Sequence, residues 1–158
     1  MNSLHPRAAR RTVWVIAFAF LGAACSSSIQ KSPTPPSPAI DLTGTWRGNF
    51  PVQGITAEMV WTLTQSGTSV SGPVLVRLPS GIVLLNGFLT GTQAGSTLTY
   101  VISVGPQGIP SQPACAGQLG GTMTVQTGVT STMNGSYTVT SSTCTPPFAS
   151  SGTISLAR

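Results

Sequence analysis

The feature that most constrains this chain is an alternation of apolar and polar residues that recurs from residue 42 onward. In residues 55–65, ITAEMVWTLTQ, every second side chain from Ile55 to Leu63 is apolar, and those between are mostly polar. Successive side chains of a β-strand point to opposite faces, so this pattern predicts a strand with one buried face. Similar patterns predict strands at residues 42–50, 68–76, 97–104, 119–125, 133–139 and 152–157.

An eighth strand is expected at residues 81–89, GIVLLNGFL, which are apolar on both faces and therefore suit a position under a loop or at a partner surface. Gly67, Gly81 and Gly95 stand where tight reversals need a positive φ. The sequence therefore predicts an all-β fold, an eight-stranded antiparallel up-and-down β-barrel at residues 41–158, with a β-sandwich as the alternative. The interruption at residues 105–117 is expected to be a lid or rim loop.

Residues 1–24 have the three parts of a secretory signal peptide: basic residues through Arg11, an apolar run from Thr12 to Ala24, and small residues at its end. As a helix, thirteen residues cover only roughly 20 Å, whereas the hydrocarbon core of a bilayer is about 30 Å thick. A cleaved signal is therefore favoured over a permanent transmembrane helix.

The segment LGAAC, residues 21–25, resembles the bacterial lipoprotein box, although Leu21 stands four residues before the cysteine and Gly22 occupies the usual aliphatic position. The resemblance implies an exported protein of the cell envelope, anchored to the membrane by a lipid on Cys25. Ser26 after the cysteine is similar to the class sorted to the outer membrane. Residues 25–40 are then a lipidated cysteine and a Pro/Ser-rich tether, extending up to about 45 Å.

The chain has three cysteines, an odd number for an exported protein. If Cys25 carries a lipid, Cys115 and Cys144 are left to pair. The strands expected after Cys115 and before Cys144 would place the two residues opposite each other at the open end of a hairpin. We therefore expect a structural disulfide rather than a redox-active one.

The opening LTGTWRG, residues 42–48, resembles the first strand of calycin barrels, the lipocalin and avidin group, in its Gly44-Thr45-Trp46 element. In lipocalins a basic residue at the end of the last strand stacks on this tryptophan, and Arg158 stands at that place. The resemblance therefore implies a structural latch between Trp46 and Arg158. The mid-barrel lipocalin motif is missing, and avidin's ring of tryptophans cannot be assembled, so biotin binding is not implied.

Charge and histidine content exclude several functions. The net charge of +5 falls to +2 without Arg7, Arg10 and Arg11 of the leader, which leaves no basic stripe for nucleic acid. The only histidine is His5, also in the leader, so the remaining chain offers no histidine for a catalytic triad or a metal site. Asp41 precedes the first strand and Glu58 lies on a polar face, which argues against a shared catalytic cleft. We expect no enzymatic activity, no metal and no cofactor.

Three residues are candidates for contacting a ligand. Trp61 and Tyr100 combine an apolar ring with a polar tip, which suits a barrel mouth, although both residue types also fill barrel cores. Arg77 follows an apolar strand and could meet an acidic ligand or end the strand in solvent. The function predicted is binding of a small apolar or amphipathic ligand in the envelope. The alternative is a structural or protein-interaction lipoprotein, of which an inhibitor is one form.

Overall fold

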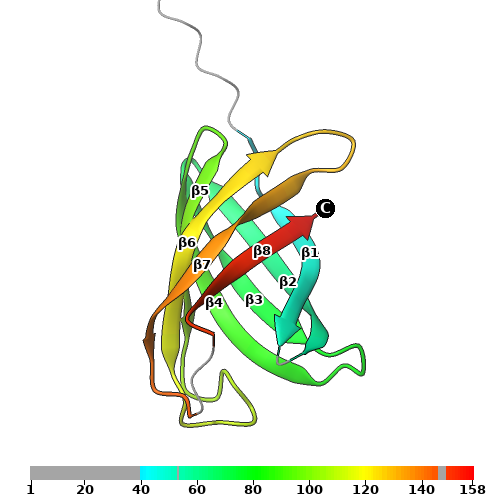
Figure 1. Ribbon diagram of the computed structural model, residues 1–158. Coiled ribbons are helices and arrows are strands. Elements are labelled where there is room, and N and C mark those ends of the chain that lie inside the picture. The colour runs from blue at the N-terminus through cyan, green and yellow to red at the C-terminus, as the bar shows by residue number, and fades with distance from the viewer. Residues whose placement is uncertain (1–39, 53, 146–148) are drawn as a thin grey trace, which may run out of the picture. The chain divides into compact units, whose positions relative to one another are not determined.

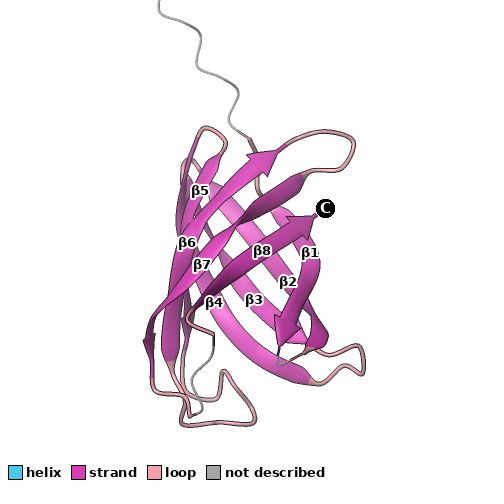
Figure 2. Ribbon diagram, in the orientation of Figure 1, coloured by secondary structure: helices cyan, strands magenta, loops and turns pink. Residues whose placement is uncertain are grey.

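The protein is described by a computed structural model that covers residues 40–52, 54–145 and 149–158 (Figure 1). Within these ranges the regular structure is entirely β, with strands joined by turns and loops (Figure 2). The expected signal peptide, Cys25 and the tether through Ala39 lie outside the described residues. The strands are β1 (Gly44–Val52), β2 (Ile55–Ser66), β3 (Ser69–Arg77), β4 (Val83–Ala94), β5 (Thr97–Val104), β6 (Gly117–Gln126), β7 (Thr132–Ser142) and β8 (Ser151–Ala157).

The eight strands form a closed antiparallel barrel in which each strand pairs with the next and β8 returns to β1. This confirms the predicted up-and-down barrel, and the alternative, a β-sandwich, is wrong. The period of two is complete in β5, where buried residues alternate with exposed ones along the whole strand. Closure pairs both sheet edges that an open meander would leave exposed.

The seam between β1 and β8 depends on a close backbone approach. Arg47 lies opposite Ala157 in the antiparallel register. A Cβ atom built at the neighbouring Gly48 would lie 1.9 Å from the carbonyl oxygen of Ser155 in β8. Only glycine therefore fits at position 48 without separating the first and last strands.

The tight turns use glycine as the sequence predicts. Gly67 between β2 and β3 has a φ of 60°, and Gly95 between β4 and β5 has a φ of 58°. Gly81 before β4 has a φ of 89°. Left-handed backbone is accessible to glycine at little steric cost, so these three residues allow the chain to reverse.

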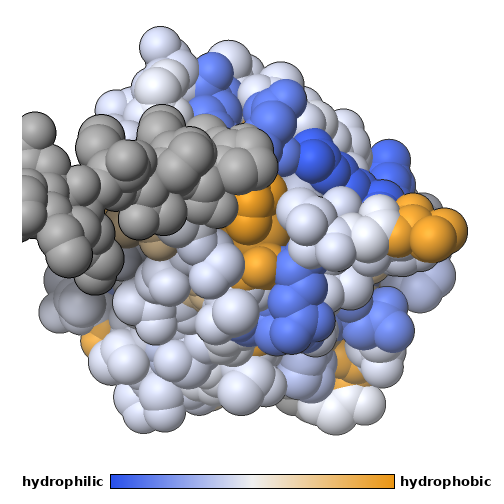
Figure 3. Space-filling model, turned by 90° about the horizontal axis from the view of Figure 1, so that it is seen from above, coloured by the Kyte–Doolittle hydropathy of each residue, from blue (hydrophilic) through white to orange (hydrophobic). Residues whose placement is uncertain are grey.

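The two ends of the barrel differ. Residues 40–43, the β4–β5 turn and Arg158 lie at the end drawn at the top of Figure 1, which we call the closed end. Where described residues are visible in the view onto this end, hydrophilic and neutral residues surround small apolar patches (Figure 3). The loop at residues 105–116 lies at the opposite end, which we call the cavity end.

The barrel interior is filled mainly by apolar side chains. The largest fully buried ones are Trp46, Trp61, Tyr100, Leu42, Leu63, Leu89, Leu98, Ile102, Met123, Met133, Val70 and Val74. Most residues that the alternation places inward are buried, but Ile55 is an exception, with 56% of its surface exposed. It begins β2 opposite Val52, the last residue of β1, so it lies at the rim of the barrel rather than inside.

Candidate ligand-binding cavity

A cavity of about 370 Å³ opens at the cavity end of the barrel. Its volume lies at the lower end of the roughly 300–1,000 Å³ typical of small-molecule sites. It is lined by Phe50, Pro51, Val52, Val76, Leu84, Leu85, Val104, Ile109, Gln112, Gly117, Gln118, Leu119, Tyr137, Val139, Ser141, Ser142, Cys144 and Ala149. The lining is mostly apolar, and none of these residues carries a charge.

The cavity exists because the inward positions at this end do not meet across the barrel. Phe50, Leu119 and Val139 continue the inward alternation of their strands, yet each is only half-buried. By contrast, inward residues toward the closed end, such as Trp46 and Trp61, are fully buried. The half of the barrel near the closed end is therefore packed, and the other half leaves apolar side chains open to a ligand.

Tyr137 is the aromatic residue that shapes one wall. Its ring centroid lies 5.8 Å from that of Phe50, in a tilted arrangement. Gly152 lies opposite Tyr137 across the β7–β8 pair, and a Cβ atom there would come within 2.7 Å of the tyrosine ring. Glycine at 152 thus leaves the space that the ring occupies. Burial raises the pKa of Tyr137, so its hydroxyl is a neutral hydrogen-bonding group at ordinary pH.

Residues 105–116 form the predicted rim loop, and two anchors hold its first part against the barrel. Ile109 is buried and lines the cavity. The backbone nitrogen of Asn86 in β4 donates to the carbonyl oxygen of Gly108 at 2.6 Å. The loop is therefore part of the cavity wall rather than a free lid.

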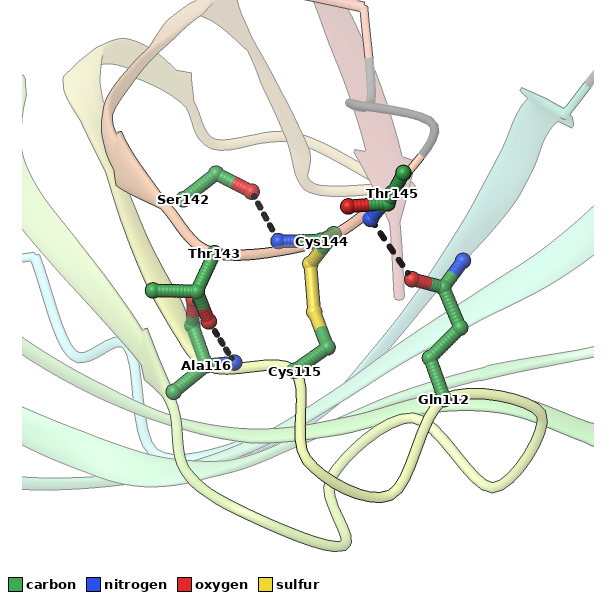
Figure 4. Close-up of a disulfide and its surroundings, with 7 residues drawn as sticks. All are labelled: Gln112, Cys115, Ala116, Ser142, Thr143, Cys144 and Thr145. Carbon is green, nitrogen blue, oxygen red and sulfur yellow. Dashed lines mark hydrogen bonds between the residues drawn. A yellow bond between two sulfur atoms is a disulfide. The ribbon is translucent and has the colours of Figure 1, made fainter.

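The second part of the loop is tied to the segment that follows β7 (Figure 4). Cys115 and Cys144 form a disulfide with their Cα atoms 4.7 Å apart, which confirms the predicted pairing. Beside it, the backbone nitrogen of Thr145 donates to Gln112 Oε1 at 2.9 Å. The amide of Ala116 donates to Thr143 Oγ1 at 3.0 Å. These contacts set the position of the polar part of the cavity rim.

Trp61 and Tyr100, the two aromatic candidates for ligand contact, lie in the packed half of the barrel. Their ring centroids are 5.2 Å apart and both side chains are almost fully buried. Neither residue is part of the cavity lining. The Tyr100 hydroxyl donates to the carbonyl oxygen of Ser136, and burial raises its pKa strongly. Within the described residues, Trp61 Nε1 is buried without a hydrogen-bond partner.

Arg77, the third candidate, lies outside the barrel wall rather than in the cavity. It pairs with Glu58 at 2.8 Å, and Glu58 also pairs with Arg47 at 2.8 Å. Hydrogen bonds from Arg77, and then from Arg47, lower the pKa of the Glu58 carboxyl. The three side chains satisfy one another on the outer face of β1, β2 and β3, so Arg77 is a member of a surface ion-pair network.

The other carboxylate, Asp41, belongs to the closed end. The backbone nitrogen of Thr43 donates to Asp41 Oδ1 at 2.8 Å, and this hydrogen bond is the main cause of a lowered Asp41 pKa. Asp41 and Glu58 therefore sit in separate networks. Among residues 40–52, 54–145 and 149–158, no three side chains of His, Cys, Asp or Glu come together to hold a metal ion.

Arg158 and Trp46, the pair implied by the calycin resemblance, meet at the closed end. The guanidinium carbon of Arg158 lies 4.5 Å from the centroid of the Trp46 ring. The same guanidinium donates to the backbone carbonyl oxygens of Asp41, at 2.6 Å, and Thr43. The indole nitrogen of Trp46 donates to the carbonyl oxygen of Leu42 at 2.9 Å. Both ends of the described chain are thus joined over one tryptophan.

The fold and the cavity together define an eight-stranded β-barrel with one packed half and one open half. No family model, curated protein or solved structure matches this chain. In the part of the chain that the structure describes, no helix is long and apolar enough to cross a membrane.

Proposed function

We propose that the chain is an exported lipoprotein, held in the cell envelope by an acylated Cys25, whose barrel binds a small apolar or amphipathic ligand without catalysis. The observation that carries the binding proposal is the cavity of about 370 Å³, with its largely apolar lining and its opening at one end of a closed barrel. Apolar pockets with a few polar groups are the usual form of small-molecule sites.

The packed half of the barrel supports this proposal because its buried side chains close the inner end of the cavity. Trp46, Trp61 and Tyr100 fill the interior toward the closed end, while the disulfide and Ile109 hold the rim loop in place. A site on a rigid wall loses little conformational entropy when a ligand binds. The Arg158–Trp46 contact is also consistent with the calycin-like architecture expected from residues 42–48.

The binding proposal is tested by titrating the full-length protein in lipid nanodiscs with the neutral fluorophore N-phenyl-1-naphthylamine, with empty nanodiscs subtracted. We expect saturable binding. Leu119→Trp, which adds a large ring inside the cavity, should abolish it. Thr122→Trp, on the outward face of the same strand, is the matched control and should bind normally. Absence of a saturable component in the unsubstituted protein would refute ligand binding.

The anchoring proposal is tested separately by mass spectrometry of the protein isolated from cell envelopes. We expect an N-terminus at Cys25 that carries a thioether-linked diacylglycerol. The Pro/Ser-rich segment through Ile40 would then serve as the tether. An N-terminus upstream of Cys25, or an unmodified Cys25 thiol, would contradict this part of the proposal.

A second candidate function is interaction with another envelope protein, which a patch on the outer wall favours. Phe88 on β4 and Val101 on β5 point outward, with 50% and 40% of their surfaces exposed. The two residues lie on strands that pair with each other in the sheet. Photo-crosslinking from position 88 in intact envelopes would yield a discrete adduct if this surface is used, and only background if it is not.

A further inference from the structure

Among the residues that the structure describes, none in the cavity wall carries a charge. Each residue around it is apolar, a glycine, a serine, a glutamine, a tyrosine or the disulfide cysteine. The Tyr137 hydroxyl stays protonated because burial raises its pKa. A charged ligand headgroup in this site would therefore be desolvated without an opposite charge, and such burial is costly.

The charged residues that the structure describes lie elsewhere, and each has partners outside the cavity. Arg47, Glu58 and Arg77 form their network on the outer face, on the other side of the barrel wall. Asp41 and Arg158 lie at the closed end. Arg77 follows Val76, a cavity residue, but it is not part of the lining and its guanidinium pairs with Glu58 on the outer face. None of these groups offers a counter-ion inside the cavity.

The polar residues of the cavity lining are neutral. Gln112 uses its Oε1 atom to accept from the Thr145 backbone, which leaves its amide NH₂ as a donor. For the Tyr137 hydroxyl, no hydrogen bond is found within the described residues. A hydroxyl or amide head can exchange neutral hydrogen bonds with such groups at no cost in buried charge.

The volume limits the apolar part of the ligand. A water molecule takes up about 30 Å³ in the liquid, and a methylene group is of similar size. The cavity of about 370 Å³ therefore accommodates roughly a dozen such groups. This matches an aliphatic chain of about ten to twelve carbons, with the head beside Gln112 and the buried Tyr137.

From these observations we infer that the cavity selects neutral amphiphiles, with an aliphatic chain of about ten to twelve carbons and a hydroxyl or amide head, over carboxylates and ammonium ions of the same length. The inference rests on the proposed ligand-binding function and adds the chemical class of the ligand. It assigns recognition to the absence of charge in the wall and to the neutral groups of Gln112 and Tyr137.

The test follows the Ile109 δ1-methyl signal by NMR in the full-length protein, in nanodiscs, because Ile109 lines the cavity. The ligands are 1-decanol, decanamide, decanoate at pH 8 and decyltrimethylammonium, with free concentrations measured in the aqueous phase. We expect the two neutral compounds to bind at least about tenfold more tightly than the two ions. Among alcohols, each added methylene should raise affinity about fourfold and the gain should stop near twelve carbons.

The possible results separate the two proposals. If decanoate or decyltrimethylammonium shifts Ile109 at the same or lower free concentration than decanol, the selection of neutral heads is overturned while ligand binding stands. If no compound shifts Ile109, ligand binding itself is overturned. Ile82 is exposed and outside the lining, so its methyl signal reports non-specific adsorption.

A charge placed in the wall provides an independent check. Val52 lines the cavity and is only half-buried, so Val52→Lys should fold and should raise the affinity for decanoate at least about tenfold. Ile82→Lys introduces the same charge at the same end but outside the lining, and should leave the affinity for decanoate unchanged. Equal effects of the two variants would contradict the inference, because they would show that general surface charge governs binding.

Discussion

Arg158, the last residue of the chain, lies over the ring of Trp46 near the start of the first strand, with 4.5 Å between the guanidinium carbon and the ring centroid. The same guanidinium donates to the carbonyl oxygens of Asp41 and Thr43. One side chain therefore joins the segment before β1 to the end of β8 at the closed end.

Replacing this residue tests the latch. Arg158→Ala should lower the free energy of unfolding by about 1–2 kcal/mol, because it removes a cation–π contact and hydrogen bonds to two carbonyls. Arg158→Lys keeps the charge but loses the planar guanidinium, so its free energy of unfolding should lie between those of Arg158→Ala and the unsubstituted protein. Thermal unfolding of the full-length protein, followed by circular dichroism, measures the effect. Equal stability of Arg158→Ala and the unsubstituted protein would show that the contact contributes nothing.

The disulfide should stabilise both the fold and the rim loop. Cys115 and Cys144 are 29 residues apart, and opening a loop of this length should cost about 3–4 kcal/mol on the chain-entropy estimate. Denaturant unfolding of the Cys115→Ala/Cys144→Ala variant measures this loss. Hydrogen exchange should also accelerate at the backbone amides of positions 115 and 145, whose acceptors both belong to Gln112. A reducing agent should have no further effect on the double variant.

Gly152 should control the shape of the cavity through Tyr137. In Gly152→Ala the new methyl group would lie 2.7–2.9 Å from atoms of the tyrosine ring, so the ring must move into the cavity. We expect weaker binding of N-phenyl-1-naphthylamine and a loss of about 1–2 kcal/mol in stability. Gly128→Ala, whose methyl group would have ordinary contacts in the β6–β7 loop, is the control. Unchanged binding in Gly152→Ala would mean that the ligand does not use the Tyr137 wall.

Acid should destabilise the barrel through its two carboxylates. The pKa values of Glu58 and Asp41 are lowered in the folded protein from ordinary values of 4.5 and 3.8. A lowered pKa means that the stabilisation is fully present above the unfolded value and is lost as pH falls through the folded one. The unfolding temperature should therefore be constant from neutral pH to about pH 5 and decline below pH 4.5.

Glu58→Gln isolates the larger of these two networks. It removes the ionisable partner of Arg77 and Arg47, so the decline of the unfolding temperature between neutral pH and pH 3 should become smaller. Thr56→Gln, an exposed substitution on the same strand, should retain the full decline. The same pH dependence in both variants would assign acid sensitivity to other groups.

The strands were predictable because their signal is local. In β5, neighbouring residues alternate strictly between inside and outside, and glycine marks the turns at Gly67 and Gly95. The exposure of Ile55 is not predicted, because the period of two gives the face of a strand but does not show where the barrel wall ends. The open half of the barrel is not predicted for the same reason: the sequence pattern at Phe50, Leu119 and Val139 is the same as that at fully buried residues.

The candidate site was harder to predict because it depends on the register between strands. Trp61 and Tyr100 are aromatic and inward, but only the pairing of all eight strands puts them in the packed half. A signal did exist at residues 81–89, whose apolar residues on both faces include Leu84 and Leu85 of the cavity wall. The strand register also shifts at Val76/Arg77 and at Gln118/Leu119, among residues near the cavity. Nothing in the local sequence marks these shifts.

The close approach of Gly48 and Ser155 also bears on how the chain folds. Seven of the eight strand pairings join neighbours in sequence, so each can form as a hairpin with a small loss of chain entropy. The pairing of β1 with β8 is the one long-range event, since it brings Arg47 opposite Ala157. A bulkier residue at position 48 should thus leave the early hairpins intact and slow the final closure, which makes this glycine a determinant of folding rate.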